Sequence, residues 1–230
     1  MGYGLKHFFS KDQKLSTHMK ATEKPSRRSF IGKTLALSST FALTGMAFKP
    51  KEQDYKIEEG ITVIGPRNGY TPLIGTLVSM LENMTSQVKN TIKDLTIDEL
   101  DYQFDDNANT IGALILHITS SEKYHQIGTF ENRPLNEEEL RFWFPARNLS
   151  DPSSKSIRGN EIDYYLQIMD DVRKDSLTGL KEKDDNWLLS LDENLSTPEA
   201  PLNKFWRWFH ACEHMSNHNG QIKFLKSRLP

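Results

Sequence analysis

The sequence contains a single cysteine, Cys212, and one thiol cannot form an intrachain disulfide. It also lacks long segments in which polar and apolar residues alternate, so nothing in it indicates a sheet. No internal repeat is present. The fold must therefore be stabilised by a packed hydrophobic core, and 230 residues are enough for one domain with such a core.

Acidic residues outnumber basic residues after the first 48 residues. Those 48 residues contain eight of the 29 lysines and arginines and two of the 31 acidic residues. Residues 49–230 therefore hold 21 basic and 29 acidic residues and have a formal charge of −8. Binding to a phosphate backbone needs clustered lysine and arginine, and no basic run occurs here. We therefore expect no nucleic-acid partner.

The N-terminal segment has the pattern of an export signal. Residues 1–24 are polar and basic, and the pair Arg27 and Arg28 precedes Phe30 and a moderately apolar stretch over residues 34–48. This arrangement resembles a twin-arginine (Tat) signal. The resemblance implies a protein that is exported to a periplasmic or other extracytoplasmic location.

The same pattern predicts how the chain is divided. We expect residues 1–48 to be the export signal, residues 49–66 a linker or lead-in, and residues 67–230 the folded domain. The alternative is an uncleaved N-terminal membrane anchor. Lys33 and several serine, threonine and glycine residues interrupt the apolar stretch, which weakens it as a spanning helix. Membrane contact is thus expected only through the N-terminal signal.

Apolar residues recur at three- and four-residue spacing in four long segments, which predicts amphipathic helices. These helices are expected at about residues 71–95, 110–128, 161–181 and 201–228. Thr71 suits the N-cap and Pro72 the first position of the first helix, and Thr96 with Glu99 fits a capping box. Residues 129–158 are too long for a tight loop, so we expect them to run the length of the bundle. The sequence therefore predicts an all-α four-helix bundle with a long crossover between helices two and three.

Histidines recur every four residues near the C-terminus. His210, His214 and His218 share one face of the last predicted helix, and His117 lies on the second helix. A histidine pair on one helix and a single histidine on another can build a three-histidine metal site inside a bundle. His210 and His218 are about 12 Å apart along the helix axis. One ion is therefore held by the 210/214 pair or by the 214/218 pair.

Three motifs resemble those of the DinB family, a DinB/YfiT-like group of metalloenzymes. Residues 95–100 match the turn after the family's first helix, and residues 110–118 end in the family's first histidine. Residues 210–222 are close to the family's histidine–histidine–Gly–Gln signature. Asn219 stands where an arginine is common in the family. The resemblance covers residues 67–229.

The resemblance implies that the metal ligands are His117, His214 and His218. Zinc or nickel is the expected ion, since imidazole suits both. His210 and Gln221 then become candidates for hydrogen bonds to a ligand histidine or to a bound molecule. The catalytic residues are unknown, because the nucleophile would be a water or a thiolate activated by the ion.

Other polar residues near these motifs have structural interpretations. We expect His125 at the solvent edge of its helix, Glu213 on a solvated helix face, and Cys212 packed among other side chains.

Two classes of function remain open. One is an exported metal-dependent enzyme with a small-molecule substrate, either a thiol transferase that uses a low-molecular-weight thiol such as bacillithiol or mycothiol, or a hydrolase. Thiol transfer is implied by the resemblance. The other is a non-catalytic metal-binding protein, in which the ion joins helix four to helix two, or a small-molecule binding module. A homodimer is compatible with both classes.

Overall fold

The computed structural model describes residues 60–230. This part of the chain folds into helices, and its β pairing is limited to an isolated bridge between Leu191 and Asn203. The predicted all-α class is confirmed. The predicted export signal, residues 1–48, and most of the predicted linker lie outside the described residues.

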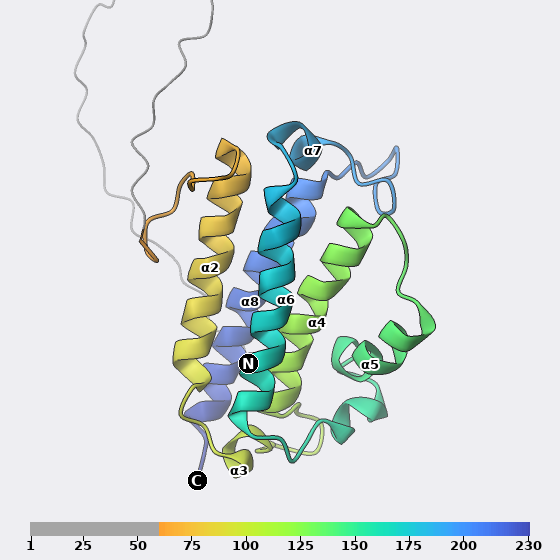
Figure 1. Cartoon of the computed structure of the whole chain (residues 1–230). Coiled ribbons are helices and arrows are strands. Elements are labelled where there is room, and N and C mark those ends of the chain that lie inside the picture. The colour runs from red at the N-terminus through yellow and green to blue at the C-terminus, as the bar shows by residue number, and fades with distance from the viewer. Residues whose placement is uncertain (1–59) are drawn as a thin grey trace, which may run out of the picture. The chain divides into compact units, whose positions relative to one another are not determined.

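Four long helices form the body of residues 60–230, and each falls close to a predicted range. They are α2 (Pro72–Ile92), α4 (Ile111–Phe130), α6 (Ile162–Lys181) and α8 (Lys204–Lys226). The four helices lie side by side (Figure 1). Helix α8 packs against both α2 and α4, and α4 also packs against α6. The interface between α4 and α8 carries the histidines of interest.

Shorter helices connect the long ones: α3 (Ile97–Leu100), α5 (Glu137–Arg147), the 3₁₀ helix η1 (Pro152–Ser156) and α7 (Asp185–Leu189). The capping box of Thr96 and Glu99 begins α3 as predicted. Within the predicted crossover, some helix is expected around residues 137–141; α5 begins there but continues to Arg147 and includes Pro145. It packs against α4, and the chain passes through it on the way from α4 to α6 (Figure 1).

The start of α2 is capped from another element. Thr71 has the extended backbone of an N-cap, but its side chain does not cap the helix. It donates instead to the carboxylate of Asp185 on α7, which also accepts from the backbone nitrogens of Leu73 at 3.0 Å and Ile74 at 3.2 Å. One carboxylate thus satisfies two of the free N–H groups at this helix end and complements its positive dipole.

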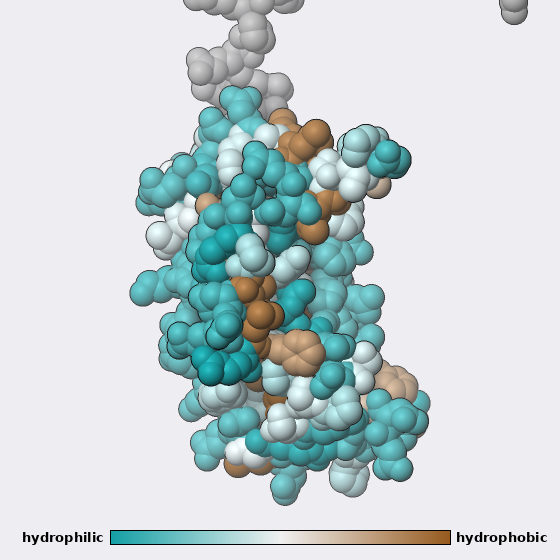
Figure 2. Space-filling model, turned by 90° about the vertical axis from the view of Figure 1, so that its right-hand side faces the viewer, coloured by the Kyte–Doolittle hydropathy of each residue, from teal (hydrophilic) through white to brown (hydrophobic). Residues whose placement is uncertain are grey.

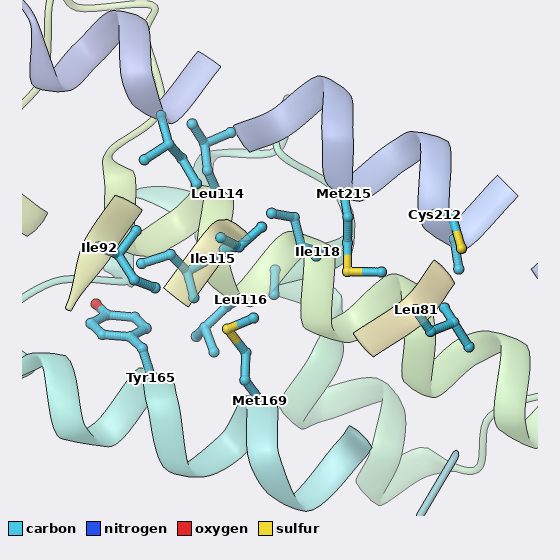
Figure 3. Packing of buried hydrophobic residues seen from close by; sticks show 14 of the residues in the cluster. Leu81, Ile92, Leu114, Ile115, Leu116, Ile118, Tyr165, Met169, Cys212 and Met215 are labelled. Atoms are coloured by element: carbon cyan, nitrogen blue, oxygen red, sulfur yellow. The ribbon is translucent and has the colours of Figure 1, made fainter. Parts of the chain in front are cut away.

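The core lies between the four long helices. Side chains from all four point into one space (Figure 3), and the labelled ones include Leu81, Ile118, Tyr165, Met169 and Met215. Cys212 is also buried there, and burial raises the pKa of its thiol to about 12. A protonated thiol in the core is a packing group, as predicted. The core fixes the spacing between α4 and α8.

The surface on the side of α5 is mostly hydrophilic, with hydrophobic residues in a narrow, interrupted column (Figure 2). Among residues 60–230, no helix combines the length and the apolar character needed to cross a membrane.

Candidate metal centre

Helices α4 and α8 bring three histidines together across their interface. His117 projects from α4, and His214 and His218 project from α8 one turn apart. The Nε2 atom of His214 lies 3.1 Å from that of His117 and 3.0 Å from that of His218. The nitrogens available for coordination all lie within 4.8 Å of one another. The geometry therefore pairs His117 with the 214/218 pair.

The three rings meet edge to face. Their planes are inclined at 62° for His117 and His214, 82° for His117 and His218, and 86° for His214 and His218. Metal–imidazole bonds of about 2.0–2.1 Å place neighbouring ligand nitrogens about 2.8–3.4 Å apart for bond angles between about 90° and 109°. The two short contacts of His214, at 3.1 and 3.0 Å, fall within that range.

Hydrogen bonds on the outer ring nitrogens determine which nitrogen faces inward. His117 Nδ1 lies 2.8 Å from the carbonyl oxygen of Ala146, which can only accept. Nδ1 therefore carries the hydrogen, and Nε2 presents its lone pair to the cluster. His218 Nδ1 donates in the same way to Gln221 Oε1 at 2.9 Å. Both rings are thus held in the tautomer that coordinates a metal through Nε2.

His214 completes the set and shows why a cation fits. Its Nε2 faces the lone pairs of His117 and His218, while its Nδ1 is buried with no hydrogen-bond partner among the described residues. A single N–H cannot satisfy two lone pairs well, whereas a cation shared by three nitrogens satisfies them all. The donor set is three imidazoles, which suits zinc or nickel.

Burial keeps these imidazoles neutral. Desolvation lowers the pKa of His117 to about 4, although its hydrogen bond to Ala146 acts in the opposite direction. Desolvation, with the neighbouring imidazoles, lowers the pKa of His214 to about 3. Desolvation also lowers the pKa of His218. All three rings are therefore unprotonated near neutral pH, which coordination requires.

His210 stands at the edge of this cluster. Its ring stacks on that of Trp206 with a centroid distance of 5.4 Å, and its centroid is 5.5 Å from that of His214. Its Nδ1 lies 3.7 Å from the carboxylate of Glu213, and both side chains are partly open to solvent. Glu213 is exposed, as predicted. His210 thus borders the cluster.

The predicted position of His125 at the solvent edge is wrong. His125 is only 5% exposed, and its Nδ1 accepts a hydrogen bond from Arg207 Nε at 3.0 Å. Arg207 forms an ion pair with Asp192 at 2.9 Å, and both side chains are 1% exposed. A buried imidazole is tolerated here because the arginine of α8 supplies its partner. The signal in the sequence is Arg207 itself, a charged residue between two tryptophans of a predicted helix.

The buried acid of α4 serves the fold and lies outside the histidine cluster. Glu122 accepts from Arg173 Nη2 at 2.7 Å and from Ser176 Oγ at 2.5 Å, and both donors belong to α6. This buried network joins α4 to α6. Among the described residues, the cluster of potential metal ligands consists of the three histidines.

Comparison with known proteins gives similarity of fold. No family model matches the sequence. No curated protein matches it either. A solved structure of a conserved protein from Enterococcus faecalis is similar, with 16% sequence identity and a TM-score of 0.50. The match covers 65% of this chain and 92% of the other.

Proposed function

We propose that this protein is a divalent-metal-dependent enzyme of the DinB type, in which His117, His214 and His218 hold the ion. The observation that carries the proposal is the convergence of three neutral imidazoles on α4 and α8. Their inward nitrogens are unprotonated in the tautomers set by the outer hydrogen bonds. Zinc or nickel is the ion that these ligands suit best.

The proposal includes the finer architecture. A DinB-like four-helix bundle is supported by the packing of α8 against α2 and α4 and of α4 against α6. A crossover between the second and third bundle helices is supported by the path of the chain through α5 (Figure 1). The Tat-type signal of residues 1–48 adds export to the proposal, with the pair Arg27 and Arg28 as its support.

Three protein ligands leave coordination positions free for a substrate, which is typical of catalytic sites. When bound, the ion would supply Lewis-acid chemistry that lowers the pKa of a coordinated water or thiol. The chain itself orients the imidazoles through Ala146 and Gln221. In this proposal His210, partly exposed beside His214, would accept a proton from an incoming nucleophile.

The reaction class follows from this chemistry. A site that binds and deprotonates a low-molecular-weight thiol supports its transfer to an electrophile, and the same site with water supports hydrolysis. The second candidate function is that of a metal-binding protein in which the ion has a structural role, and one observation favours it. The ligands come from two helices, so an ion would also join α4 to α8.

Turnover by the full chain tests the proposal. The zinc- or nickel-loaded protein is assayed for conjugation of bacillithiol or mycothiol to a fluorogenic electrophile and for hydrolysis of activated esters. We expect turnover that needs the metal and falls about 100-fold or more in His214→Ala. Asn217→Ala changes an exposed residue of the same helix and serves as the control. Absence of metal-dependent turnover, together with unfolding on chelation, would instead establish the structural role.

A further inference from the structure

A cavity of about 360 Å³ lies between α4, α5 and the residues that lead into α8. Its volume is in the range of small-molecule sites. Its lining combines arginine side chains with an aromatic ring and aliphatic side chains, and includes Tyr124, Arg133, Leu135, Leu140, Arg147 and Arg207. This mixture suits a ligand with one charged end and an apolar body.

Two of the three arginines are already neutralised by carboxylates. Arg133 donates to both carboxylate oxygens of Glu139, at 2.7 and 2.8 Å, and its Nε donates to Glu131 at 2.7 Å. Arg207 is paired with Asp192 inside the protein. Arg147 forms no ion pair or hydrogen bond with any residue between 60 and 230. Arg147 is therefore the arginine of the cavity that has no carboxylate partner in this part of the chain.

The guanidinium of Arg147 is held in place by an aromatic ring. Its central carbon lies 3.9 Å from the centroid of the Tyr124 ring, and the side chain is partly buried. Burial lowers the pKa of Arg147, and the nearby charge of Arg207 acts in the same direction. Stacking leaves the edge of the guanidinium free for a bidentate acceptor. An anion there would supply the counterion that a partly desolvated arginine lacks.

Two residues that line the cavity lie close along the chain to residues of the candidate metal centre. Arg147 directly follows Ala146, whose carbonyl accepts the hydrogen bond from His117 Nδ1. Tyr124 is seven residues after His117 on α4, which is about 10 Å along the helix axis. A ligand anchored at Arg147 would thus lie about two helical turns from the three histidines.

We propose that this cavity binds the carboxylate of an amphiphilic organic acid, with Arg147 as its bidentate partner. The exposed side chains of Leu140 and Leu195, which line the cavity, would cover the apolar body of the ligand. A carboxylate matches the one unpaired guanidinium, whereas a phosphate dianion would leave excess negative charge against aliphatic walls. Binding of a carboxylate in this cavity does not depend on the proposed function. Only the further step, that the bound acid is a substrate of the metal centre, rests on the proposed function.

Binding of hexanoate to the full chain tests this proposal. Titration calorimetry is run on the protein as purified and again in the presence of a chelator. The chelated sample separates this test from the proposed function, because the cavity needs no metal to bind an anion. We expect hexanoate to bind with a Kd of about 1 mM or tighter and 1-hexanol, its neutral analogue, to bind about tenfold more weakly or worse. Inorganic phosphate is the second anion and is expected to bind more weakly than hexanoate.

Two matched variants identify the residue responsible. Arg147→Gln keeps a polar side chain of similar length and removes the charge, and we expect it to weaken hexanoate binding by about tenfold or more. Arg141→Gln changes an exposed arginine of the same helix and should leave binding unaltered. Circular dichroism establishes that both variants are folded. Equal affinity for hexanoate and hexanol, unchanged affinity in Arg147→Gln, no binding by the parent, or tighter binding of phosphate would each overturn the proposal.

Discussion

One amide on α8 determines which nitrogen of His218 faces the candidate metal centre. Gln221 Oε1 accepts from His218 Nδ1 at 2.9 Å, which leaves the lone pair on Nε2. Gln221→Leu keeps the size of the side chain and removes the acceptor, so the coordinating tautomer loses its support. We predict that this change weakens zinc affinity by about tenfold, the size of effect typical for partners of ligand histidines.

Competition with a chromophoric chelator measures that affinity. Asn217→Ala, an exposed change one residue before His218, controls for general effects on α8. Parent-like affinity in Gln221→Leu would show that the hydrogen bond does not orient the ring.

The carbonyl of Ala146 acts on His117 as Gln221 acts on His218, but no side-chain substitution removes it. It comes from the end of α5, a helix that follows α4 after a short connection. The position of α5 therefore contributes to the histidine cluster. This contact was not predictable, because the sequence gives no signal for which carbonyl a buried imidazole will meet.

At the scale of elements, Gly128 on α4 leaves room for the side chain of Arg207 on α8 to lie against it. A Cβ atom at Gly128 would lie 2.0 Å from Arg207 Nη2. Arg207 cannot move away without breaking its buried ion pair with Asp192. We therefore predict that Gly128→Ala lowers the free energy of unfolding by about 3–5 kcal/mol, the usual cost of breaking a buried pair.

Gly220→Ala is the matched control for that prediction, since it is a helical glycine with no neighbouring atom within 4 Å. We expect it to stabilise the protein slightly, by up to about 1 kcal/mol, as alanine does in exposed helix positions. Denaturant unfolding measures both variants. Equal stability of Gly128→Ala and Gly220→Ala would contradict the close packing of Arg207 over α4.

The helices were predictable to the extent that their stabilising residues are local. Apolar periodicity placed α2, α4, α6 and α8, and the box of Thr96 and Glu99 was readable from a few neighbouring residues. Helix α7 was missed, and so was the full length of α5. The cap of α2 was also assigned to Thr71 alone, whereas Asp185 supplies it from more than a hundred residues away.

For the molecule as a whole, the spacing of histidines indicated the candidate site, and the structure shows which of them meet. Histidines at every fourth residue of α8 left two histidine pairs open as ligands. Packing against α4 brings His117 to the 214/218 pair. The burial of His125 was not predictable, because it depends on Arg207 and Asp192 from two further segments. The position of Arg147 could not be predicted for the same reason, because it stacks on the ring of Tyr124, which lies on another helix.

Metal content is the measurement that tests the account most directly. The full chain, His117→Ala, His214→Ala and the control Asn217→Ala are purified, incubated with zinc or nickel, desalted and analysed by elemental mass spectrometry. The account predicts about one ion per chain in the parent and the control, and loss of the ion in both histidine variants with the helical content retained. A parent that holds no zinc or nickel, or a His117→Ala variant that keeps a full complement, would contradict it.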